Sequence, residues 1–79
     1  MQEELIQRVK DFRLVFEGKE GQRVLDYLSK YCLEHNATFD PNSATNTAFN
    51  EGARKVILEI RRIMNIRLDE QKQEFAVND

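Results

Sequence analysis

The stretch TAFNEGARKVILEI, residues 47–60, decides the fold because it is the clearest helical signal in the chain. Its apolar residues recur every three or four positions, which predicts an amphipathic helix over residues 46–65. The stripe consists of Phe49, Ala53, Val56, Ile57, Ile60, Ile63 and Met64. Gly52 lies inside this helix, where a glycine costs roughly 1 kcal/mol relative to alanine. This cost calls for a structural explanation of the glycine at this position.

Two more helices are predicted upstream. The first covers residues 3–16, where Leu5, Val9, Phe12 and Phe16 follow the helical spacing. Two glycines, Gly18 and Gly21, then turn the chain. The second helix covers residues 21–35, and its apolar face is made of Val24, Leu25, Leu28, Tyr31 and Cys32.

The segment NATFDPNSATN, residues 36–46, is rich in Asn, Ser and Thr and contains the proline, so it is predicted to be a loop. Phe39 lies in the middle of it. An aromatic residue inside a polar loop favours an anchor that holds the loop to the core. A role in facing a partner is the alternative.

These elements predict an all-α fold, a small bundle of three helices in a single helical domain over residues 1–67. The helical signal weakens after Asn65. Residues 68–79 are predicted to form either an acidic C-terminal tail or a short fourth helix. Phe75 and Val77 would let this tail dock on a partner.

Composition limits the classes of function. The 79 residues carry a net charge of −2 and 33% charged side chains, which is typical of a soluble surface rather than of a strongly basic nucleic-acid binder. One cysteine and one histidine, Cys32 and His35, supply neither the ligand spacing of a metal site nor a nucleophile motif. We expect no enzyme activity, no cofactor and no metal. The acidic N-terminus and the lack of a long apolar run predict a cytoplasmic protein without a membrane span.

Positive charge is concentrated in the third predicted helix. Residues 51–67 hold five basic and two acidic side chains, whereas residues 68–79 hold one basic and four acidic ones. A surface of this kind can contact phosphate groups. The candidate contact residues, for a partner or for phosphate, are Arg54, Lys55, Arg61 and Arg62. Alternatively, these side chains pair with the acidic tail or with the first helix.

Three stretches together resemble the Bbp19-like family of small tailed-phage proteins: FRLVFEGKEGQRVLDYL at 12–28, TFDPN at 38–42, and TAFNEGARKVILEI at 47–60. The resemblance covers residues 12–66. The matching positions are Phe12, Phe16, Gly21, Val24, Leu25, Phe39, Glu51, Gly52 and Arg54. The resemblance implies a phage gene of the late morphogenesis region and brings no catalytic residue with it.

Within this resemblance, Gly52 is interpreted as a site of close approach. We expect it on the inner side of the third helix, where a second backbone comes near and offsets the helix penalty. Glu51 and Arg54 flank it and are expected to hydrogen-bond the loop or the turn at Gly21.

The favoured function is non-enzymatic: protein–protein contact in virion assembly, at the head or its DNA-entry vertex. The partner would be a phage or host protein, or a second copy of the chain. One alternative is a nucleic-acid-binding or packaging accessory protein that uses the basic residues of the third helix. Another is an inhibitor of a host protein. The expected location is the host cytoplasm or the virion.

Overall fold

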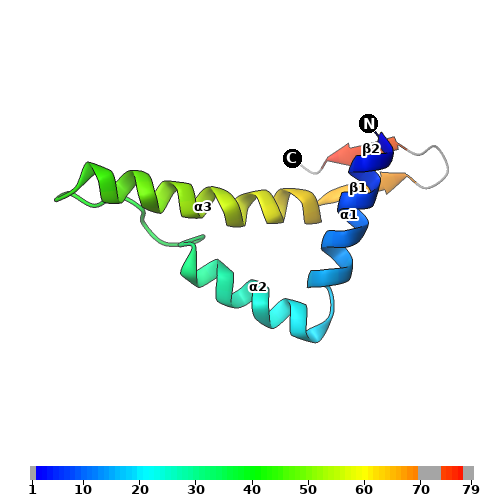
Figure 1. The fold of residues 1–79 in the computed structure, drawn as a ribbon, viewed down its shortest axis with the longest axis horizontal. Coiled ribbons are helices and arrows are strands. Elements are labelled where there is room, and N and C mark those ends of the chain that lie inside the picture. The colour runs from blue at the N-terminus through cyan, green and yellow to red at the C-terminus, as the bar shows by residue number, and fades with distance from the viewer. Residues whose placement is uncertain (1, 70–73, 78–79) are drawn as a thin grey trace.

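The computed structural model describes residues 2–69 and 74–77. Three helices form, α1 (Gln2–Phe16), α2 (Lys19–Tyr31) and α3 (Ala44–Met64), followed by two short strands, β1 (Ile66–Asp69) and β2 (Glu74–Val77). The all-α fold of three helices predicted from the sequence is confirmed (Figure 1). Both α1 and α3 lie within two residues of their predicted bounds, whereas α2 starts two residues earlier and ends four residues earlier than predicted.

The long axis of the molecule follows α3 (Figure 1). Helix α2 runs back beneath α3 in the opposite direction, and α1 crosses the C-terminal end of α3. The three helices thus outline an open triangle, with overall extents of 52 × 27 × 19 Å.

Two separate apolar clusters hold the helices together. Val9 of α1 packs with Ile63 of α3 and with Ile66 at the start of β1. Leu25 and Cys32 pack with Ile57 at the middle of α3. The aromatic pair of α1 links the two clusters, because Phe12 packs against the first cluster and Phe16 against the second. Their rings meet edge to face at 6.2 Å.

The turn between α1 and α2 depends on Gly21. A Cβ at this buried position would lie 2.6 Å from Phe16 Cα and 2.8 Å from Phe16 C, and closer still to the carbonyl oxygen of Val15. These are backbone atoms that cannot move aside as a flexible side chain can. Gly21 is therefore the position where two helix ends approach closely and a side chain has no room.

Helix α2 ends at Tyr31 rather than at residue 35 because the backbone turns left-handed at Leu33, with φ of 59°. The Leu33 N–H donates to the carbonyl of Lys30 and the Glu34 N–H to that of Ser29. This pair of bonds is a Schellman motif, which normally carries glycine or asparagine at the left-handed position. Leucine gives no such signal in the sequence, so the early end could not be predicted.

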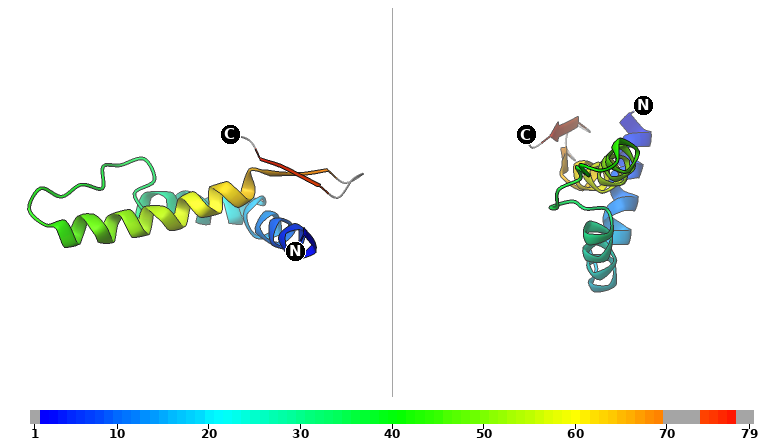
Figure 2. Two further views of the ribbon diagram at one scale, coloured as in Figure 1. Left: turned by 90° about the horizontal axis from the view of Figure 1, so that it is seen from above. Right: turned by 90° about the vertical axis from the view of Figure 1, so that its left-hand side faces the viewer.

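The loop before α3 returns alongside the first turns of that helix (Figure 2). Ser43 caps α3 by accepting from the Asn46 N–H. Further on, the Thr38 hydroxyl donates to Glu51 and the Asn50 side chain to the Thr38 carbonyl. These polar bonds hold the loop. The prediction that Phe39 anchors it is wrong, because this side chain is 72% exposed.

The short fourth helix left open for residues 68–79 is not found; the described residues there form strands. β1 pairs antiparallel with β2 in the register Ile66↔Val77 and Leu68↔Phe75. Ile66 is buried, Arg67 exposed and Leu68 intermediate, an alternation with the period of two that strands require. Arg13 of α1 also donates to the Ile66 carbonyl. The predicted boundary between residues 67 and 68 falls inside β1, and residues 70–73 and 78–79 lie outside the described residues.

Candidate interaction site

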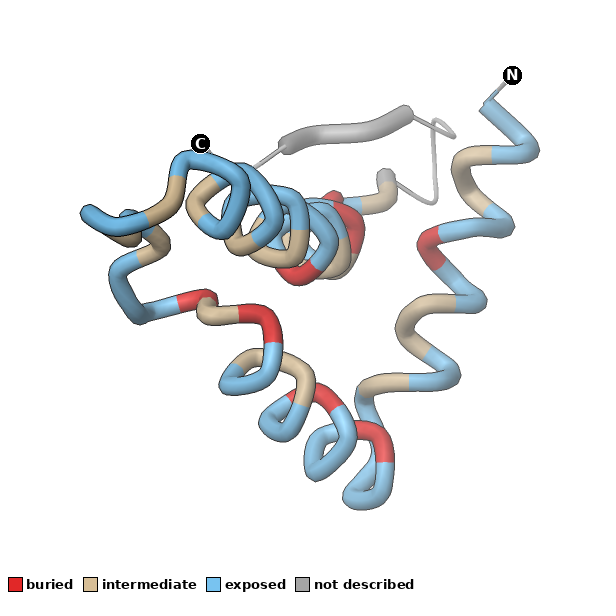
Figure 3. The backbone as a smooth tube through the Cα atoms, turned by 60° about the vertical axis from the view of Figure 1, so that its left-hand side comes forward, coloured by how far each residue is buried: buried red, intermediate tan, exposed pale blue. Residues whose placement is uncertain are grey.

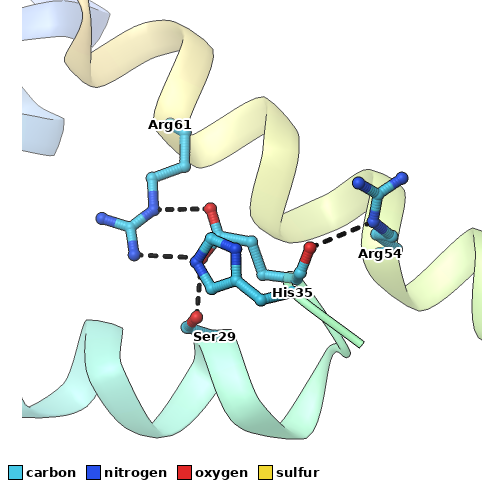
Figure 4. Close-up of polar contacts among 5 residues, drawn as sticks. Ser29, His35, Arg54 and Arg61 are labelled. Atoms are coloured by element: carbon cyan, nitrogen blue, oxygen red, sulfur yellow. Dashed lines mark hydrogen bonds and ion pairs between the residues drawn. The ribbon is translucent and has the colours of Figure 1, made fainter. Parts of the chain in front are cut away.

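A polar cluster joins the end of α2 to α3 on one side of the molecule. Its centre is Glu34, a charged side chain that is only 7% exposed. Arg61 donates from Nε to Glu34 Oε2 at 2.9 Å and from Nη2 to Oε1 at 3.0 Å, and Ser29 Oγ donates to Oε1 at 2.6 Å (Figure 4). Arg54 Nε donates to the Glu34 backbone carbonyl at 3.2 Å. His35 Nε2 lies 3.5 Å from Glu34 Oε1, and its side chain is exposed.

The electrostatics of this cluster favour an ionised carboxylate. The Arg61 hydrogen bonds lower the pKa of Glu34 below its ordinary value, assisted by the Ser29 hydroxyl, while burial of the carboxyl acts in the opposite direction. Both carboxylate oxygens of Glu34 accept hydrogen bonds from side chains of the same chain. The cluster therefore links the end of α2 to α3 through an ion pair and hydrogen bonds.

The basic residues predicted to contact a partner or phosphate lie around α3 in different environments. Arg54 and Arg61, seven residues apart, both face Glu34. Arg62 forms a bidentate pair with Glu59, with both bonds at 2.8 Å. Lys55 is exposed on the outer side of α3. Three of the four cations thus donate hydrogen bonds within the chain.

A shallow hollow of about 400 Å³ lies on that outer side of α3, lined by Glu51, Gly52, Arg54, Lys55 and Leu58. All its lining residues come from one helix. Small-molecule sites are concave and bury most of the ligand between converging groups. A hollow with a single wall does not provide that.

The prediction of a close backbone approach at Gly52 is wrong. Gly52 is exposed, and a Cβ there would meet nothing within 4 Å. Of its flanking residues, Glu51 bonds to Thr38 of the loop as expected, whereas Arg54 bonds to the carbonyl of Glu34, in the turn that follows α2 and outside the predicted loop. The intrinsic cost of Gly52 in the helix is not offset by packing within the chain.

An apolar face lies on the other side of the α2–α3 pair. We define it by its exposed large side chains: Val24, Tyr27 and Tyr31 of α2, and Phe49 and Val56 of α3. Phe49 is 73% exposed, Tyr31 71% and Val56 57%. Sequence patterning placed Val24, Tyr31, Phe49 and Val56 in apolar helix stripes but could not show that they stay uncovered.

Helix geometry places these residues on one side. Val24 directly precedes the buried Leu25, Tyr31 precedes Cys32, and Val56 precedes Ile57. These three residues are therefore rotated about 100° from the inward direction in the same sense, whereas Tyr27, two residues after Leu25, is rotated about 160° and lies at the outer edge of the face. Helices α2 and α3 run in opposite directions (Figure 1). Equal rotations therefore bring both stripes to the same side of the two helices.

Residues of α3 that directly follow an inward-facing residue point to the opposite side, where the polar cluster lies. Arg54 follows Ala53 and Arg61 follows Ile60, two residues that pack on the second apolar cluster. The buried positions of α2 lie toward the interior of the triangle, with exposed positions around them (Figure 3). Helices α2 and α3 thus have a polar side, where Glu34 bonds to Arg54 and Arg61, and an apolar side whose side chains are exposed.

Within the described residues, no three His, Cys, Asp or Glu side chains are grouped to hold a metal ion. None of the helices in the described part of the chain has the length and apolar character of a membrane span.

Comparison with known proteins agrees with the resemblance found in the sequence. The chain matches no curated protein and no solved structure. The family model described as Bbp19-like phage protein matches residues 12–76, which is most of the sequence. The chain therefore belongs to the Bbp19-like family of phage proteins.

Proposed function

We propose that this small phage protein acts by protein–protein contact in virion assembly, at the head or its DNA-entry vertex. The observation that carries the proposal is the apolar face of α2 and α3. Large exposed apolar patches on a soluble protein mark interaction sites. Tyrosine and phenylalanine, which supply three of its five residues, are enriched at protein interfaces.

The hydrogen bonds of the basic residues favour this proposal over phosphate contact. Arg61 and Arg62 are each bidentate to a carboxylate of the same chain, and Arg54 is bonded to a backbone carbonyl. A phosphate surface needs cations that are free to replace counterions. If the nucleic-acid alternative holds instead, DNA binds the purified protein with an affinity that falls steeply as salt rises.

The encoding phage provides the direct test. We expect mass spectrometry of purified virions to detect this chain at a fixed copy number. We also expect a phage carrying Val56→Lys, on the apolar face, to yield far fewer finished particles. Leu58→Lys is the matched control, because Leu58 is exposed on the outer side of the same helix. Normal particle yield for both variants, with the chain absent from virions, contradicts the proposal.

A complex with one host protein, formed in infected cells without any effect of Val56→Lys on particle yield, would favour the inhibitor alternative. Binding assays with the purified chain and host extract separate the two outcomes. The same pair of lysine variants serves as probe and control.

A further inference from the structure

The isolated chain leaves an unusual amount of its surface uncovered. It exposes 6323 Å², whereas a compact monomer of its 9.3 kDa mass exposes about 5,000 Å². Its radius of gyration is 15.3 Å, against about 12 Å for a compact domain of this length. The large exposed apolar side chains of α2 and α3 contribute to this surface, and an obligate homodimer buries about 1,000–2,500 Å² on each protomer.

The core within one chain is correspondingly small. Only six hydrophobic side chains of residues 2–68 are buried: Val9, Leu25, Cys32, Ile57, Ile63 and Ile66. They are divided between two clusters. Small domains with so little core commonly gain stability by oligomerisation. A permanent partner of this kind must always be present when the chain folds, and a second copy meets that condition.

The apolar face also has the chemistry of a homodimer interface. Along α2, Val24, Tyr27 and Tyr31 are spaced three and four residues apart, and the two tyrosine rings are stacked at 6.0 Å with 12° between their planes. Along α3, Phe49 and Val56 are two turns apart, with Ala53 between them and no charged residue on that line. On α2, the exposed Glu20 lies one turn before Val24, at the end of the stripe. Aromatic enrichment and a lack of charge distinguish the centre of such interfaces.

The arrangement of the two helices shows how this face would be covered. Helices α2 and α3 run in opposite directions (Figure 1) and both expose large apolar side chains, and such a surface needs a second layer to cover it. We infer that the apolar face of α2 and α3 packs against the same face of a second copy of this chain, in a two-fold symmetric dimer. This inference rests on the proposed function, because it names the first partner that the apolar face contacts. A two-fold contact uses the same patch on both copies, so no additional surface is required.

Sedimentation equilibrium of the purified full chain tests the inference. The buffer contains a reductant so that Cys32 forms no intermolecular disulfide. We expect the wild-type chain to sediment at twice its 9.3 kDa mass. Val56→Lys should raise the dissociation constant about 100-fold or more, as expected for a charge placed at the centre of an interface. Leu58→Lys on the outer side should leave it unchanged.

A second variant and a second measurement cover the case in which Val56→Lys does not fold. Phe49→Ser removes an exposed ring without adding charge and should also weaken the dimer. The wild-type melting temperature should rise with protein concentration, as mass action requires of a folded dimer.

Three results would overturn the inference. One is a wild-type chain that remains a monomer up to about 1 mM, where even weak interfaces are occupied. Another is a dimer that Val56→Lys and Phe49→Ser leave intact. The third is equal weakening by Val56→Lys and Leu58→Lys. These outcomes are independent of the virion experiment. A monomer found in virions refutes the dimer alone. A dimer that is absent from virions, with normal particle yield for both lysine variants, refutes the assembly role alone.

Discussion

Replacing Gly21 with alanine should destabilise the protein, although alanine is the better helix former. The new Cβ would lie 2.6 Å from Phe16 Cα, whereas carbon atoms in contact normally stay about 3.5–4.0 Å apart. The end of α1 must therefore move by about 1 Å relative to α2. Overpacking of this kind typically costs about 1–3 kcal/mol and occasionally more, and the helix propensity of alanine returns about 1 kcal/mol.

Because the close contacts at Gly21 are all to backbone atoms, we take the upper end of this range, about 3 kcal/mol, which leaves a net loss of about 2 kcal/mol out of a total stability of roughly 4–12 kcal/mol. Gly52→Ala is the matched control, because the same change there meets open space and should raise stability by up to about 1 kcal/mol. Urea unfolding followed by circular dichroism at a fixed protein concentration measures both. The midpoints should move in opposite directions, with Gly21→Ala lower by about 1–2 M. A Gly21→Ala protein as stable as the wild type would refute the argument from close approach.

Three further predictions concern α3 and the polar cluster. The pKa of Glu34 is lowered in the folded chain, so its ionised carboxylate stabilises the fold above pH 4.5 and this stabilisation is lost as pH falls through the folded pKa. Glu34→Gln should therefore cost about 2 kcal/mol of unfolding free energy at pH 7. The same variant should show a smaller fall of the urea midpoint on the acid side. Arg61→Gln should cost about 2 kcal/mol, whereas Arg62→Gln, in an exposed pair, should leave the urea midpoint nearly unchanged in the same assay. Ile57→Ala should lose about 2–5 kcal/mol, and Val56→Ala much less when measured on dilute protein; equal losses would show that burial in the monomer does not control stability.

Periodicity was sufficient to predict the three helices and part of the core. Leu25 and Ile57 sit on predicted apolar stripes and are nearly fully buried. The strands at the C-terminus were missed because four residues with a period of two give a weak signal next to a long helix. The end of α2 was missed because leucine, and not glycine, takes the left-handed position.

The polar cluster could not be predicted from the chain order. Glu34 and Arg61 are 27 positions apart, and nothing in their neighbouring residues marks them as a pair. The two glycines show the same limit. Gly21 and Gly52 each stand in a helical segment, yet only the arrangement of α1 against α2 makes one of them indispensable to packing.

The apolar stripe of α3 shows what a sequence pattern does and does not specify. The pattern includes Val56 and Ile57 on equal terms, because helical spacing records that a side is apolar and not what covers it. Within one chain, Ile57 is fully buried in the cluster with Leu25 and Cys32, whereas Val56 is 57% exposed. Valine and phenylalanine that remain exposed add no more to the stability of the monomer than polar residues would. A stripe of this width therefore fits a helix that is covered from two directions, by α2 within the chain and by a partner over the apolar face.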